Sequence, residues 1–212
     1  MSKINISFGS NFQNKEMIES AIEAAEQYVF ERLKITWDVE LRVSDEPREN
    51  LILEDGVGGR TITSSLIEFV INEKVATESK IFEMVSHELC HAARWGYNSE
   101  WMNTLFDGVI SEGIATCFEA EIMKDRDEKT FFIKTVIERS DEENERILEL
   151  LKDQLDAKEY DYNSIFFNGS DKLPRWAGYS LGYYLVKKYL DKTGKSIEEA
   201  YTDKYADFTL TK

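Results

Sequence analysis

The chain contains two histidines, and they mark the ends of the segment whose residue types best suit metal binding and catalysis. The segment HELCH begins at His87 and ends at His91, inside a stretch at about 78–95 whose apolar residues recur at helical spacing. Residues four apart on a helix share one face, so both imidazoles can bind one metal ion. Glu88 follows the first histidine, where its carboxylate can take a proton from metal-bound water. The pattern predicts a catalytic metal site with Glu88 as the general base.

A catalytic zinc site usually has three protein ligands and leaves one position for water. No third histidine exists, so the third ligand is expected to be oxygen or sulfur. Glu112 is the leading candidate because a loop and the start of a second helix fit the 21 residues after His91. Glu119 and Asp107 remain alternatives. Two imidazoles and a carboxylate suit zinc, so we expect one Zn²⁺ per chain. Gly113 is expected to let the second helix approach the metal helix closely.

The elements that position these residues follow from the spacing of apolar side chains. Before residue 75 we expect strands at 4–8, 36–43 and 66–71, a helix at 15–33, and turns at Asp55-Gly56 and Gly58-Gly59. After residue 75 we expect helices at 78–95, at 104–123, from about 130, after Ser140, and from Pro174 to about 190, with a loop at 160–173. Strands followed by helices indicate an α+β fold. We expect one domain over 1–212, sheet-rich at 1–75 and helical at 76–212.

The composition excludes several classes of function. The chain has 212 residues, with 26 basic and 41 acidic side chains and a net charge of −15. Such a charge disfavours binding to nucleic acid or to an anionic membrane surface. Two cysteines, Cys90 and Cys117, exclude a disulfide scaffold and are expected to pack in the core. No apolar stretch is long enough to span a membrane and no signal peptide is recognisable, so we expect a cytoplasmic protein.

The motif and its surroundings resemble the gluzincin metallopeptidases, in which HExxH is followed about twenty residues later by a glutamate. The chain is also similar to a bacterial family of predicted zinc-dependent proteases without a defined physiological role. The resembling segments span roughly 50–190 and are Gly56–Thr61, His87–His91, Ser111–Ala115 and Ala177–Gly182.

This resemblance implies a zincin-like fold in which His87, His91 and Glu112 bind zinc and Glu88 is the catalytic base. It also implies that a tyrosine stabilises the oxyanion, with Tyr179 as the candidate and Tyr183 as the alternative. By the same resemblance, the strand at 66–71 would be an edge strand that lines the cleft and pairs with an extended peptide.

The sequence therefore predicts zinc-dependent hydrolysis of peptide bonds, with a peptide or protein as the substrate. One alternative is a catalytically silent metal-binding or interaction module on the same fold, with the 160–173 loop closing the cleft. Another is hydrolysis of a non-peptide amide. The oligomeric state has no signal in the sequence.

Overall fold

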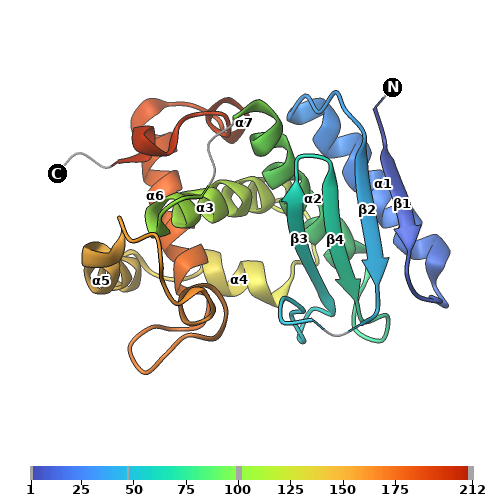
Figure 1. The fold of residues 1–212 in the computed structure, drawn as a ribbon, viewed down its shortest axis with the longest axis horizontal. Helices are drawn as coiled ribbons and strands as arrows, with labels where there is room; N and C mark the ends of the chain where they lie inside the picture. The colour runs from blue at the N-terminus through green and yellow to red at the C-terminus, as the bar shows by residue number, and fades with distance from the viewer. Residues whose placement is uncertain (1, 47, 99–101, 210–212) are drawn as a thin grey trace. The chain divides into compact units, whose positions relative to one another are not determined.

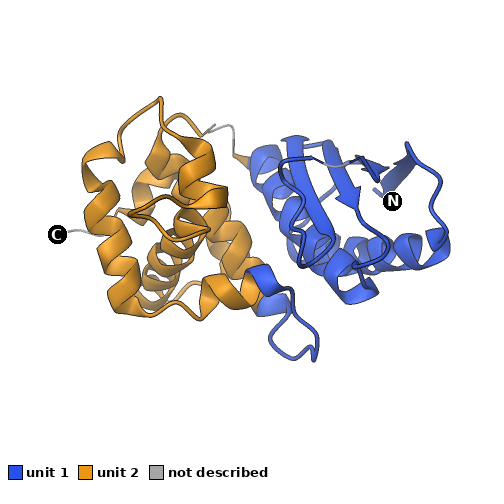
Figure 2. Ribbon diagram, turned by 90° about the horizontal axis from the view of Figure 1, so that it is seen from below, with its two compact units in different colours: residues 1–97, 121–132 blue, residues 98–120, 133–212 orange. Residues whose placement is uncertain are grey.

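The computed structural model describes residues 2–46, 48–98 and 102–209. The chain forms two compact units, coloured separately in Figure 2. Unit 1 comprises residues 1–97 and 121–132, and unit 2 comprises residues 98–120 and 133–212. The chain therefore leaves unit 1 after the metal-motif helix, returns to it for twelve residues, and then completes unit 2.

Unit 1 is built on a four-stranded sheet with strand order β1-β2-β4-β3 (Figure 1). The strands are β1 (Ile4–Phe8), β2 (Val39–Ser44), β3 (Val57–Thr63) and β4 (Leu66–Ile71). The first three strands in this spatial order run parallel, whereas β3 runs antiparallel to β4. This topology leaves β1 and β3 as the two edges of the sheet.

Two helices cover one face of this sheet, α1 (Lys15–Arg32) and α2 (Glu78–Tyr97) (Figure 1). The apolar stripe of α1 is buried, and α2 is buried on all sides from Ile81 to Arg94 because it also packs against α1 and β3. Along β2 the buried residues alternate with more exposed ones, as expected for a sheet with one covered face. Thus α2, which the sequence spacing grouped with the later helices, lies with the sheet in unit 1.

Unit 2 is helical. Its elements are most of α3 (Leu105–Ile122) and of α4 (Phe131–Ile137), then α5 (Asp141–Leu151), η1 (Lys152–Gln154), the π-helix η2 (Asn163–Asn168), α6 (Ala177–Thr193), α7 (Ile197–Ala200) and η3 (Tyr205–Phe208). Ser140 and Glu143 form the expected capping box at the start of α5. The mixture of a sheet and helices confirms the α+β class.

Three expectations about the elements are wrong. Gly58 and Gly59 lie inside β3 rather than in a turn, and they are small because other groups pack directly against the strand. The strand at 66–71 is central rather than an edge, since β4 pairs with both β2 and β3. Pro174 lies before α6, which begins only after Trp176, a residue in the left-handed conformation with φ 60°.

The 160–173 segment also differs from the expected loop, because it contains the π-helix η2. Within the residues that the structure describes, none of the helices combines the length and apolar character needed to cross a membrane.

Candidate metal centre

The two histidines lie side by side in the middle of α2. Their ring centroids are 5.0 Å apart and the rings are inclined by 69°. Both side chains are buried, with 3% of His87 and 5% of His91 exposed. Spacing of four residues on an α-helix produces this arrangement, as the sequence predicts. Two adjacent, buried imidazoles can supply two of the ligands of a metal site, and they are unusual in an ordinary helix core.

Glu88 lies under the edge strand β3 and is held there by Thr61. The Thr61 hydroxyl donates a hydrogen bond to Oε2 of Glu88 at 2.7 Å and lies 2.9 Å from the main-chain oxygen of the same residue. A β-carbon at Gly59 would come within 2.3 Å of Cγ and 2.6 Å of Oε1 of Glu88. Glycine at this position therefore makes room for the carboxylate, and the threonine two residues later orients it.

The short segment that returns to unit 1 is fixed by two buried carboxylates. Asp55 accepts hydrogen bonds from the main-chain N–H groups of Phe131 and Phe132, at 2.7 and 3.0 Å. Glu83 accepts bonds from both the main-chain N–H and the hydroxyl of Thr130. This attachment brings the Phe132 ring edge-on to His87, with centroids 6.3 Å apart.

Asp55 is fully buried, and burial raises the pKa of its carboxyl above the usual value. The two N–H donors and the Lys80 ammonium, whose Nζ lies 3.9 Å from Oδ1, act in the opposite direction and lower the pKa.

His91 has an aromatic neighbour as well, the Trp95 ring at 6.0 Å. Both imidazoles therefore pack against aromatic rings of unit 1, which limits their rotation.

Glu112 lies on α3, in unit 2, and is buried, with 6% of the residue exposed. Of the two alternatives, Asp107 caps the start of its own helix, where its Oδ2 accepts main-chain N–H groups of Asn103 and Thr104. Glu119 is fully buried two turns beyond Glu112. His87, His91 and Glu112 form a buried group whose side chains could hold a metal ion.

Gly113 allows a close helix contact, but the helix that approaches it is α6. A β-carbon at Gly113 would lie 2.3 Å from the main chain of Gly182, and one at Gly182 would lie 2.2 Å from the Val109 oxygen. The expectation that Gly113 serves the contact with the metal helix is therefore corrected to a contact within unit 2. This crossing packs α3 and α6 together at Gly113 and Gly182, one residue after Glu112 and three residues after Tyr179.

The two tyrosines of α6 differ in their surroundings. The buried Tyr179 packs its ring perpendicular to Phe166, with centroids 5.6 Å apart, and against Phe167 of the same π-helix. Tyr183 is half-buried, and burial raises its pKa to about 12, with smaller contributions from Cys117 and Asp191. Tyr179 thereby packs α6 against η2, the π-helix in the segment expected to be a loop.

Tyr160 is a further residue beside Glu112 that the sequence patterns do not reveal. Its hydroxyl would lie 3.1 Å from a β-carbon at Gly108, one turn before Glu112 on α3. Burial raises the pKa of Tyr160, and the charges of Glu112 and Asp107 raise it further. Sequence patterns do not reveal Thr61 and Phe132 either, because each approaches the HExxH motif from a distant part of the chain.

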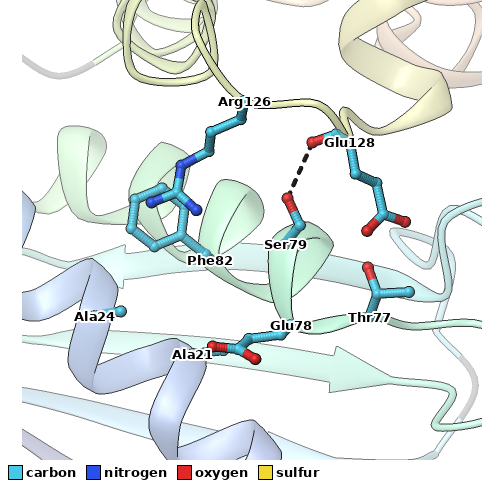
Figure 3. Close-up of a pocket in the computed structure, with 8 residues that line it drawn as sticks. All are labelled: Ala21, Ala24, Thr77, Glu78, Ser79, Phe82, Arg126 and Glu128. Carbon is cyan, nitrogen blue, oxygen red and sulfur yellow. Dashed lines mark hydrogen bonds between the residues drawn. The ribbon is translucent and has the colours of Figure 1, made fainter.

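Figure 3 shows a different concave region of unit 1, with a volume of about 330 Å³, at the first turn of α2. The guanidinium of Arg126 stacks on the Phe82 ring there, and the Ser79 hydroxyl donates to the main-chain oxygen of Glu128 at 2.9 Å. None of the residues that line this pocket belongs to the histidine pair or to Glu88.

Comparison with known proteins identifies the family. The chain belongs to the family described as predicted Zn-dependent protease (DUF2268), whose model matches residues 15–209. No curated protein and no solved structure matches the chain. The family description supports the expectation of a zinc protease, and the buried His–His–Glu group suggests that zinc is the metal bound.

Proposed function

We propose that this protein is a gluzincin-type peptidase that hydrolyses peptide bonds, with His87, His91 and Glu112 as ligands of one zinc ion and Glu88 as the general base. The observation that carries the proposal is the buried histidine pair on α2, with the adjacent Glu88 carboxylate held by a hydrogen bond from Thr61 of β3. The family description agrees with this activity.

The donor set fits zinc on chemical grounds. Two neutral imidazoles and one carboxylate are ligands that zinc accepts readily, and three protein ligands leave a position for the reaction. The packing of Phe132 and Trp95 holds the two imidazoles in place before any ion binds. When bound, zinc supplies Lewis acidity, which makes water a better nucleophile at neutral pH and polarises the substrate carbonyl.

Glu88 moves the protons in this mechanism. Its carboxylate takes a proton from the attacking water and later delivers that proton to the amine that leaves when the C–N bond breaks. Such a shuttle requires a carboxylate with a fixed position, and the bond from Thr61 to Oε2 supports that requirement. Because Oε2 is engaged, Oε1, on the Gly59 side, is the oxygen that we assign to proton transfer.

The substrate is proposed to bind as an extended strand along the outer edge of β3. This strand, and not β4, is the edge next to Glu88. Main-chain hydrogen bonds to an edge strand bind peptides without requiring particular side chains. We assign the hydrogen bond to the developing oxyanion to Tyr179, whose ring is fixed by Phe166 and Phe167.

The decisive variant is Glu88→Gln, which keeps the size of the side chain and removes the base. We expect it to bind zinc as the wild type does and to lose hydrolysis of a peptide library by roughly 10²- to 10⁴-fold. Full peptidase activity in this variant would contradict the mechanism. Full zinc occupancy in the wild type without any cleavage would instead favour the silent metal-binding module.

A further inference from the structure

The outer edge of β3 is free on only one side of Glu88. Towards the start of the strand, the main-chain N–H of Ile52 donates to the Val57 oxygen at 3.0 Å, in an isolated antiparallel bridge. Two residues further on, Nδ2 of Asn50 donates to the Gly59 oxygen at 2.8 Å. The segment 48–52, which we call the edge strap, therefore engages the outward main-chain oxygens of β3 at Val57 and Gly59.

The strap is fitted to the strand rather than lying loosely over it. A β-carbon at Gly58 would come within 2.2 Å of the Asn50 oxygen and 3.0 Å of the Leu51 α-carbon, so only glycine allows this approach. At the other end of the strap, the Arg48 guanidinium pairs with Glu68 of β4 at 2.5 Å. The strap thus contacts β3 through main chain and an amide side chain, and contacts β4 through an ion pair.

Beyond Gly59, no described segment of unit 1 pairs with the outer edge of β3. Main-chain groups along a strand point alternately to either side, so Thr61 directs its N–H and C=O the same way as Val57 and Gly59. The strap ends before Thr61, and the regular register with β4 continues to that residue before a bulge between Thr61 and Thr63. Glu88 lies against Gly59 and Thr61, which is where the closed part of the edge meets the open part.

We propose that Asn50 and the edge strap make substrate recognition one-sided, so that Asn50 is a specificity-determining residue. This inference rests on the proposed peptidase function. An added peptide pairs with the outward main-chain N–H and C=O of Thr61, but loses main-chain partners as soon as it passes Gly59. Beyond Thr61 the bulge sets Thr63 opposite Leu66 with its main-chain groups towards β4, so the outward pairing is centred on Thr61. Antiparallel pairing is the more stable mode, and the strap itself pairs with β3 in that way.

For an antiparallel peptide, the paired residues are those on the N-terminal side of the bond that is cut. Residues on the C-terminal side of the cleaved bond meet the edge strap and therefore make no main-chain hydrogen bonds to β3. The substrate class that follows is an extended peptide with at least two or three residues before the cleaved bond and no requirement for a long segment after it.

The test is a synthetic library of randomised decapeptides, read by mass spectrometry, followed by peptides trimmed from each end around a preferred cleavage site. For zinc-loaded wild type, shortening the N-terminal side from four residues to one should lower kcat/KM by about tenfold or more, because two hydrogen bonds are lost. Shortening the C-terminal side by the same amount should change kcat/KM less than about threefold.

The variant Asn50→Ala frees the Gly59 oxygen as an acceptor. We expect it to raise kcat/KM severalfold for peptides with a longer C-terminal side and to leave peptides with one residue there unchanged. Asn98→Ala is the matched control, since Asn98 also donates its side-chain amide to a main-chain oxygen, that of Thr202, but in unit 2. This control should leave the cleavage profile as it is in the wild type.

A second readout does not depend on cleavage. In the Glu88→Gln variant, an uncut peptide should slow amide hydrogen exchange at Thr61 and leave Val57 to Gly59 unaffected. Equal dependence on both sides of the cleaved bond, or equal protection along all of β3, would overturn the one-sided site. No cleavage of any library member by zinc-loaded wild type would instead refute the proposed function itself.

Discussion

The hydroxyl of Thr61 donates to the carboxylate of Glu88 across the contact between β3 and α2, at 2.7 Å. This bond joins the edge of the sheet to the residue that we assign as the general base. The two residues are 27 positions apart in the chain, so the pairing exists only because α2 packs against β3. Glu88 therefore has a fixed orientation that depends on the sheet as much as on its own helix.

Removal of this hydroxyl should reduce catalysis without removing the metal. In Thr61→Val the side chain keeps its shape but loses its donor, and a hydrogen bond to a charged group contributes about 1.5–3 kcal/mol. We expect kcat to fall roughly 10- to 100-fold, with zinc content and KM close to those of the wild type. Thr61→Ser should restore most of the rate. A valine variant with unchanged kcat would show that Glu88 is oriented by other contacts.

The neighbouring glycines of β3 should differ sharply when each is changed to alanine. In Gly59→Ala the new β-carbon meets the Glu88 side chain, so we expect kcat to fall at least about tenfold while zinc remains bound. In Gly58→Ala the β-carbon points to the opposite face and meets the edge strap, so Glu88 should keep its position. Zinc content and kcat should be measured for both variants. Equal losses of kcat would contradict the assignment of Gly59 to the Glu88 contact and of Gly58 to the edge strap.

The buried Asp55 should make the stability of unit 1 depend on pH in an unusual direction. Its pKa is raised on folding, so the folded protein binds a proton more tightly than the unfolded chain. The contribution of Asp55 is therefore greatest below its unfolded value, near 3.8, and decreases as the pH rises through the higher folded value. Ordinary paired carboxylates behave oppositely.

This dependence can be measured against Asp55→Asn, which cannot ionise. The free energy of unfolding in urea should be compared for the two proteins between pH 4 and pH 7. We expect the advantage of the wild type over the variant to shrink as the pH rises through this range. An advantage that grows with pH would mean that the N–H groups of Phe131 and Phe132 and the charge of Lys80 outweigh the effect of burial.

Three tyrosine-to-phenylalanine variants test which hydroxyl stabilises the oxyanion. Tyr179→Phe removes one hydroxyl and keeps the ring that packs on Phe166, so the helix should stay intact. We expect kcat to fall roughly 10²- to 10³-fold with little change in KM, as when an oxyanion donor is removed. Tyr183→Phe and Tyr160→Phe should each cost less than about tenfold. A larger loss in either of these would transfer the role to that residue.

Sequence patterns were sufficient for the local features of this protein. The spacing of apolar residues locates β1, α1, β4 and α2 within a few positions, and the four-residue spacing places the two histidines on one face of α2. The capping box at Ser140 is likewise a local signal. These features depend on residues that are close in the chain.

The features that were missed depend on distant contacts. The Gly58-Gly59 pair was interpreted as a turn because glycine marks turns in most sequences, whereas here Asn50 and Glu88 approach the strand from opposite faces. The central position of β4 depends on strand order, which no single-strand pattern encodes. Thr61 and Tyr160 have no motif of their own and become candidates only through their neighbours in the folded chain.

The most direct test of the proposed centre is metal content by plasma mass spectrometry, on protein purified without chelator. We predict close to one zinc per chain in the wild type and a large loss in Glu112→Gln. The matched variant Glu119→Gln, which alters a second buried glutamate two turns along α3, should keep the metal. Absence of zinc from the wild type even after reconstitution would contradict the account. Full zinc in Glu112→Gln would exclude that residue as a ligand.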